Sequence, residues 1–195
     1  MKIVLATRNP GKLKELIELA GDAPWLELVL APEGFDPEES GSTFIENARI
    51  KAMAAAALTG LPAIADDSGL VVEALDGRPG VHSARYCQGS DRERRAKLLS
   101  EMKEIAEDCR QAAFVCNMVV CSPTGEIMFT AEGRWPGRIG LAERGQNGFG
   151  YDPVFFLEGR DQTAAELDSS EKNKVSHRGQ AWRKVLSFLS VSAPA

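Results

Sequence analysis

Short apolar runs alternate with amphipathic segments along the chain, which is the pattern of an α/β protein. Residues 2–6 (KIVLA) form a buried-strand run that ends in polar residues. A helix is predicted to begin at Pro10, with Asn9 as its N-cap and Gly21 just after its end. Between them, apolar residues recur at helical spacing over residues 13–20.

Two capping boxes predict two further helices. The box Thr43–Glu46 opens a helix that runs to about Thr59, and Ser90–Glu93 opens one that runs to about Ala106. We expect a last helix over residues 176–189.

Five more apolar segments have the length and flanks of strands. They are residues 26–30, 63–65, 112–121, 127–131 and 153–157. The turn sequence 122–125 (SPTG) joins two of them as a hairpin. Strands separated by helices, with a hairpin later, predict an α/β fold with a mixed central sheet flanked by helices. A chain of 195 residues suits one domain, or two small lobes that share a core.

The charge balance argues against two classes of partner. The net charge is −5 and the isoelectric point is about 5.2, so general binding to nucleic acid or to an anionic membrane is disfavoured. The most apolar stretch, residues 52–61, is shorter than the roughly 20 residues that span a bilayer. The N-terminus lacks the long apolar run of a signal peptide, so we expect a soluble cytoplasmic protein.

The cysteines indicate neither a disulfide framework nor a zinc site. There is no CxxC pair, and the chain has only two histidines. We expect the four cysteines to be small buried hydrophobic residues, with Cys116 and Cys121 on opposite faces of a strand.

The strand-to-helix junction at residues 7–12 (TRNPGK) is a candidate anion site. Backbone N–H groups at a helix start attract anions, Arg8 and Lys12 add positive charge, and Gly11 allows close approach. It is not a Walker A loop, because the earlier glycine and the following Ser or Thr are absent. An ordinary strand-to-helix turn explains the same residues.

Adjacent carboxylates at Asp66 and Asp67 form a second candidate. They follow the predicted strand 63–65 and are expected in a turn with Ser68 and Gly69. Two neighbouring carboxylates repel unless a cation or a function compensates, and one could hold Mg²⁺ or act as a general base. Glu38 or Glu39 in the acidic loop 31–41 could complete a metal site. The alternatives are a solvated turn and a solvated loop.

Two later segments could contact a planar ligand. Glycines flank Phe149 in residues 147–153 (NGFGYDP), which would let its ring stack on a nucleobase. Lys172 and residues 176–180 (SHRGQ) place basic groups near a helix start, where an anion or a carbonyl-rich ligand would offset their charge. The alternatives are a buried aromatic in a flexible loop and a structural histidine. The basic residues between Arg92 and Lys97 are interpreted as a solvated helix face.

Six stretches together resemble the inosine/xanthosine triphosphate pyrophosphatase family. They are residues 7–12, 43–51 (TFIENARIK), 65–69 (ADDSG), 77–86 (GRPGVHSARY), 148–155 (GFGYDPVF), and Lys172 with 176–180. Each stretch alone is weak evidence for the resemblance, but the six occur in the family's order over nearly the whole chain.

The resemblance implies an elongated mixed sheet in one domain, residues 1–195, with two lobes around a substrate cleft. It implies Mg²⁺-dependent cleavage of inosine, deoxyinosine and xanthosine triphosphates to the monophosphate and pyrophosphate, by a homodimer. Alternatives are a pyrophosphatase of modified or pyrimidine nucleoside triphosphates and a non-catalytic nucleotide-binding module.

The resemblance also implies residue roles. Asp67 would be the catalytic carboxylate and a metal ligand, with Glu38 as the second ligand and Glu39 as its nearest rival. Contacts to substrate would come from Thr7, Arg8, Asn9, Pro10, Gly11, Lys12, Lys51, Ser68, Phe149, Gly150, Tyr151, Asp152, Lys172, His177 and Arg178. Among these, Thr7, Asn9, Lys12 and Lys51 would hold phosphates. His177 and Arg178 would donate to the 6-keto oxygen of the purine, a contact that the 6-amino group of adenine cannot make.

Overall fold

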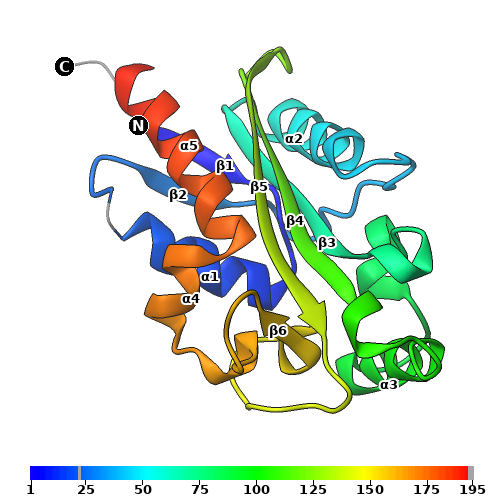
Figure 1. Cartoon of the computed structure of the whole chain (residues 1–195). Coiled ribbons are helices and arrows are strands. Elements are labelled where there is room, and N and C mark those ends of the chain that lie inside the picture. Colours follow the sequence, from blue (N-terminus) through cyan, green and yellow to red (C-terminus); the bar gives the residue numbers. More distant parts are fainter. Residues whose placement is uncertain (22, 193–195) are drawn as a thin grey trace. The chain divides into compact units, whose positions relative to one another are not determined.

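The computed structural model describes residues 1–21 and 23–192, and its elements alternate much as the sequence predicts (Figure 1). The helices are α1 (Pro10–Ala20), α2 (Phe44–Thr59), α3 (Asp91–Glu101), α4 (Ser169–Val175) and α5 (His177–Ser192). The strands are β1 (Lys2–Leu5), β2 (Glu27–Leu30), β3 (Ala63–Val72), β4 (Gln111–Cys121), β5 (Ile127–Ile139) and β6 (Phe155–Leu157). Short 3₁₀ turns, including Gly80–Arg85 and Asp152–Val154, connect them.

The strands form one mixed sheet in the order β2-β1-β3-β4-β5-β6. β1 pairs in parallel with β2 and with β3, and β5 pairs antiparallel with β6. Parallel pairs need crossover helices, and α1 and α2 supply them early in the chain. The predicted α/β class with a mixed sheet is therefore confirmed.

The chain divides into two compact units. Of the described residues, the first unit comprises 1–21, 23–67, 116–133 and 178–192, and the second comprises 68–115 and 134–177. The long strands β3, β4 and β5 each contribute residues to both units. The expectation of two lobes around a substrate cleft stays a prediction.

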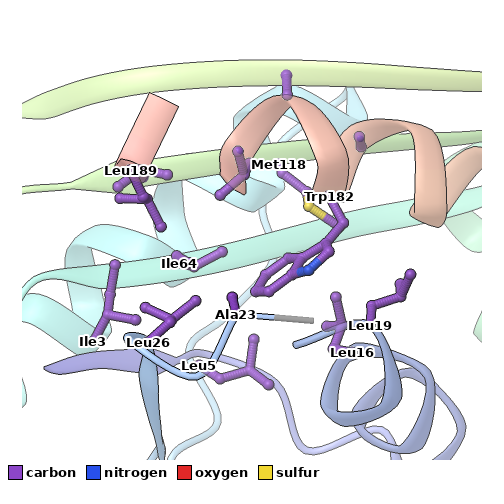
Figure 2. Packing of buried hydrophobic residues seen from close by; sticks show 14 of the residues in the cluster. Ile3, Leu5, Leu16, Leu19, Ala23, Leu26, Ile64, Met118, Trp182 and Leu189 are labelled. Carbon is purple, nitrogen blue, oxygen red and sulfur yellow. The ribbon is translucent and has the colours of Figure 1, made fainter. Parts of the chain in front are cut away.

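The first unit packs helices on both faces of its strands. On one face, α1 and α5 cover Ile3, Leu5 and Ile64, and the indole of Trp182 lies at the centre of this cluster (Figure 2). On the other face, small side chains of α2, such as Ala52, pack against Val4 and Ala65. The alanine-rich sequence of α2 allows this helix to pack closely on the sheet.

The second unit has its own core, rich in aromatic residues. Phe114, Trp135 and Phe155 pack on one another, with ring centroids 4.5–6.3 Å apart. Leu98 and Met102 bring α3 and the turn after it onto this core. Tyr151, from the segment after β5, belongs to the same core.

The helix starts confirm the local predictions. Asn9 accepts from the first-turn N–H groups of α1, Thr43 and Glu46 form the capping box of α2, and Ser90 and Glu93 form that of α3. Each cap satisfies N–H groups that have no partner within the helix.

Several predicted boundaries were wrong. The strand 63–65 does not end at the aspartates: β3 continues to Val72, so residues 66–69 are strand rather than turn. α3 ends at Glu101 instead of about Ala106, β5 continues to Ile139, and the short helix α4 precedes the last helix. Buried partners override the turn preference of Asp, Ser and Gly in β3, as the site below shows.

The cysteines follow the prediction in part. Cys116 and Cys121 are buried and belong to the clusters on opposite faces of the sheet. Cys109 is exposed, so the expectation of four buried cysteines was wrong. Within the described ranges, every helix is too short or too polar to serve as a membrane span.

Candidate active site

Asp66 and Asp67 stand next to each other in β3 and face different partners, as alternation along a strand requires. Asp66 is only 1% exposed. Its Oδ2 lies 3.0 Å from Nζ of Lys12 and accepts from Nε and Nη2 of Arg178, each at 3.4 Å. The first aspartate is therefore a buried anion between two cations.

Asp67 is held mainly by α2. Nδ2 of Asn47 donates to its Oδ2 at 3.2 Å, and Nζ of Lys51 lies 3.3 Å from its Oδ1. The same Nζ pairs with Oε1 of Glu39 at 2.7 Å, and Nζ of Lys12 is 3.9 Å from Asp67 Oδ1. Lys51 thus joins two carboxylates, and Lys12 lies within ion-pair distance of both aspartates.

The surroundings move the pKa values of the two aspartates in opposite directions. Burial raises the pKa of Asp66, but the charges of Lys12 and Arg178 outweigh it, so the pKa lies well below the ordinary 3.8. For Asp67, burial is again the largest effect, and Lys51 and Lys12 only partly offset it, so the pKa is raised. A pair of carboxylates with separated pKa values is typical of acid–base sites.

A second buried ion pair extends this cluster. Nη1 of Arg178, at the start of α5, pairs with Oε2 of Glu15 in α1. Burial lowers the pKa of Arg178, but the carboxylates of Glu15 and Asp66 raise it further, so the guanidinium is charged. The side chains of Glu15 and Arg178 are almost fully buried, which makes this pair costly to break from one side.

The junction at residues 7–12 forms a capped helix start. Oδ1 of Asn9 accepts from the N–H groups of Gly11 and Lys12 at 3.0 and 3.1 Å, and Thr7 Oγ1 accepts from the N–H of Asn9. Asn9 therefore already binds two of the backbone amides that could have bound an anion. The positive charge of this junction comes from its side chains, including the ammonium of Lys12. Arg8 is exposed.

In the second unit, Lys172 and Asp152 form a buried ion pair beside Phe149. Nζ of Lys172 lies 2.5 Å from Oδ2 of Asp152, and that oxygen also accepts from the N–H of Phe149 at 2.9 Å. The same Nζ lies 5.0 Å from the centroid of the Phe149 ring, a cation–π distance. Asp152 therefore fixes both the lysine and the backbone that carries the ring.

Tyr151 and His177 are buried against this framework. The Tyr151 hydroxyl donates to the carbonyl of Ser83 at 2.9 Å. The imidazole of His177 stacks on Phe114, with centroids 4.9 Å apart, and on Trp135 at 6.4 Å. Aromatic stacking fixes the plane of the imidazole, so its ring nitrogens point in set directions.

Comparison with known proteins identifies the chain's relatives. The sequence pattern of the Ham1 family matches residues 3–188, nearly the whole chain. The chain belongs to the Ham1 family. A dITP/XTP pyrophosphatase of Haemophilus influenzae is 50% identical over 184 residues, covering 92% of this chain and 94% of that protein. One of Geobacter sulfurreducens is also 50% identical, covering 92% of each.

Solved structures of Ham1 proteins share the fold. A HAM1 protein from Coxiella burnetii has a TM-score of 0.87 and 43% identity, covering 97% of this chain and 98% of that one. A nucleoside-triphosphatase/dITP/XTP pyrophosphatase from Mycobacterium abscessus has a TM-score of 0.76 and 46% identity, covering 95% and 99%.

Within this Ham1 chain, the predicted site residues fall into two clusters. In the first unit, Lys12, Lys51 and Arg178 contact the aspartates, and Lys12 belongs to the helix start that also includes Thr7, Arg8, Asn9, Pro10 and Gly11. Those of the second unit are Ser68, Phe149, Gly150, Tyr151, Asp152, Lys172 and His177. Glu38 is exposed, and it is Glu39 that reaches Lys51. Among the described residues, no group of three or more His, Cys, Asp or Glu side chains forms a ready-made metal cage.

Sequence reasoning missed Asn47 and Glu15. Asn47 lies four residues before Lys51 and therefore on the same face of α2, and Glu15 lies three residues after Lys12 on α1. Helical spacing from an already selected lysine was the signal that could have found both.

Proposed function

We propose that this Ham1 protein hydrolyses inosine, deoxyinosine and xanthosine triphosphates to the nucleoside monophosphate and pyrophosphate. The observation that carries the proposal is the buried cluster of Asp66 and Asp67 with Lys12 and Lys51. The related proteins named dITP/XTP pyrophosphatases, 50% identical over most of the chain, support the same activity.

Asp67 has the properties of the catalytic carboxylate. Its raised pKa makes it a stronger base than an ordinary aspartate, which suits it to accept a proton from an attacking water. Asn47 and Lys51 bind different oxygens of Asp67 and so fix the plane of its carboxylate. Asp66, with its lowered pKa, stays ionised and holds Lys12 in place.

Mg²⁺ fits the oxygen donors of this cluster. The ion is usually held by one or two carboxylates together with substrate phosphates, so a pair of carboxylates suffices. We propose Asp67 and Glu39 as the pair, because one ammonium group, that of Lys51, contacts both. Glu38 is the weaker candidate because it is exposed. When bound, the ion would neutralise charge on the phosphates.

Lys12 and Lys51 are the proposed phosphate ligands. Both ammonium groups are largely buried, where each positive charge acts more strongly than in water. Neighbouring carboxylates outweigh the burial that would lower the pKa of Lys51, so it stays charged. Such fixed charges can stabilise the charge that develops on a leaving pyrophosphate.

Recognition of the base is proposed for the second unit and for Arg178. Phe149 would stack on the purine, and the charge of Lys172 beside its ring would favour a carbonyl-bearing base. His177 and Arg178 would donate to the 6-keto oxygen, whereas adenine presents an amino group at that position.

The test is pyrophosphate release in the presence of Mg²⁺ with a panel of ITP, dITP, XTP, ATP, GTP, dTTP and UTP. The expected result is pyrophosphate and monophosphate from ITP, dITP and XTP, with little turnover of ATP. Release of orthophosphate alone would contradict the proposed bond cleavage. Preference for dTTP or UTP would favour the alternative, a pyrophosphatase of modified or pyrimidine nucleoside triphosphates.

The family resemblance further suggests a homodimer that acts on the cytoplasmic nucleotide pool. Light scattering coupled to gel filtration would measure the mass in solution against the 21.1 kDa of one chain.

A further inference from the structure

The segment that carries Phe149 is bound to α3 at Gly150, through both polar groups of its backbone. The N–H of Gly150 donates to Oδ2 of Asp91 at 2.7 Å. Its carbonyl accepts from Nη1 of Arg95 at 2.9 Å. Both polar groups of Gly150 are thus bound by two side chains that lie about one turn apart on the same helix.

The two side chains are themselves fixed. Oδ1 of Asp91 accepts from Nη2 of Arg94 at 2.6 Å, and Nη2 of Arg95 donates to Oε2 of Glu143 at 3.0 Å. The Ser90–Glu93 capping box sets where α3 begins, and so where Asp91 points. The basic segment therefore does more than form a solvated face, because the side chain of Arg95 is only 13% exposed.

Asp91 is a charged acceptor in this contact. Burial raises the pKa of Asp91, but the bonds from Arg94 and from the Gly150 amide outweigh it, so the pKa lies below its ordinary value. Hydrogen bonds to an ionised acceptor are stronger than those between neutral groups.

The two hydrogen bonds to Gly150 matter because of where this residue lies in the chain. Gly150 has a φ of +61°, which favours glycine, and it lies between Phe149 and Tyr151. On one side the N–H of Phe149 is bound by Asp152, and on the other Tyr151 is anchored on Ser83. Together with these contacts, the two hydrogen bonds from α3 fix the backbone of residues 149–151, and so orient the ring of Phe149.

We propose that Asp91 and Arg95 are positioning residues for nucleobase recognition, acting on Phe149 through Gly150. The inference rests on the proposed function and deepens it, because it assigns part of the base specificity to a helix that does not itself carry the base-binding groups. A ring held in advance avoids the entropy cost of ordering the loop when the base binds.

The experiment compares Asp91→Ala and Arg95→Ala with Arg92→Ala, an exposed change on the same helix. Steady-state kinetics are measured with ITP and with ATP. We expect each positioning variant to raise KM for ITP roughly tenfold, with kcat within about twofold of the wild type. The kcat/KM preference for ITP over ATP should fall by a similar factor.

Two further measurements separate positioning from a general loss of structure. Asp91→Asn keeps an acceptor oxygen for the Gly150 N–H, so it should restore most of the ITP affinity. Amide hydrogen exchange should increase at residues 148–152 in both alanine variants and stay unchanged in Arg92→Ala. If one of the two alanine variants fails to fold, hydrogen exchange in the other variant still tests the positioning role.

The outcomes distinguish the two proposals. A wild-type enzyme that releases no pyrophosphate from ITP overturns the proposed function, and the recognition role falls with it. An active wild type whose Asp91 and Arg95 variants match Arg92→Ala in KM and in exchange overturns the positioning role alone. A fall in kcat and melting temperature at unchanged KM also overturns it, because that is the signature of a purely structural contact.

Discussion

The charged groups of the first unit and those of the second are held in different ways. Asp66 and Asp67 project from a long strand, and their partners Lys12, Asn47 and Lys51 lie on helices. Phe149 itself lies on the connection between β5 and β6, which is fixed by hydrogen bonds to its backbone and by the ion pair of Asp152 with Lys172 of α4. Rigid elements suit groups that must keep a set distance during bond cleavage, and a supported loop suits groups that recognise a ring.

The two clusters should therefore differ in which kinetic parameter their variants change. Changes around the aspartates of the first unit should lower kcat, because those groups are the ones proposed to act on the reacting phosphates. Changes around Phe149 should raise KM and weaken base selectivity with little effect on kcat. The experiments below test this division.

The largest effect is expected for Asp67→Asn. The amide has nearly the same shape but cannot accept a proton from water, so kcat should fall by about 10³-fold. Pyrophosphate release measures the loss, and a melting curve close to that of the wild type would show that the fold survives. Asp36→Asn, an exposed change in the acidic loop, is the control. Near-normal turnover by Asp67→Asn would remove this residue from the mechanism.

Glu39→Gln is expected to have the next largest effect, lowering kcat/KM by about 10²-fold and raising the Mg²⁺ concentration needed for half-maximal rate. The physical reason is that Glu39 and Asp67, the two carboxylates that contact Lys51, are the proposed Mg²⁺ ligands, and the variant removes one of these negative charges. Glu38→Gln is the matched comparison from the neighbouring position, and we expect a smaller loss. The reverse order would return the second metal ligand to Glu38.

Phe149→Ala tests the second cluster. Loss of base stacking, worth about 1–3 kcal/mol, should raise KM for ITP by roughly 20-fold while kcat changes little. Phe149→Tyr keeps the aromatic face and should retain most of the affinity. If Phe149→Ala lowered kcat and left KM unchanged, the proposed division between the clusters would fail.

The pH dependence should give the smallest shift. The raised pKa of Asp67 means that, before Mg²⁺ binds, the carboxyl is protonated at a higher pH than an ordinary aspartate of pKa 3.8. Because kcat/KM reports the free enzyme, its loss on the acid side should begin at that higher pH when the Mg²⁺ concentration is low. Lys51 lowers the pKa of Asp67, so Lys51→Met should move this acid limb upward by about one pH unit. A limb that stayed in place would show that another group controls it.

Local signals in the sequence predicted the helix starts well. N-caps and capping boxes depend on residues within one turn, so Asn9 and Thr43 could be placed without knowledge of the fold. The course of β3 could not be predicted this way. Asp-Asp-Ser-Gly favours a turn, and a buried strand is possible there because the aspartates have partners distant in sequence. These partners are Lys12, Asn47, Lys51 and Arg178.

The candidate site shows the same limit. The family motifs could name candidate residues, which stay predictions, but the pairing of those residues depends on tertiary structure. Arg95 was read as part of a solvated face because its partner, Gly150, lies 55 residues away. α4 was missed because its sequence, SSEKNKV, is almost entirely polar and shows no apolar period.

Each unit contains one buried indole, and this provides two independent optical probes. Trp182 lies at the centre of the first unit's core, and Trp135 packs in that of the second, while Trp25 is more exposed than either. Variants that keep a single buried tryptophan would report the melting of one unit at a time by fluorescence. Coincident transitions would indicate one cooperative folding unit, and separate transitions would give each half of the molecule its own stability.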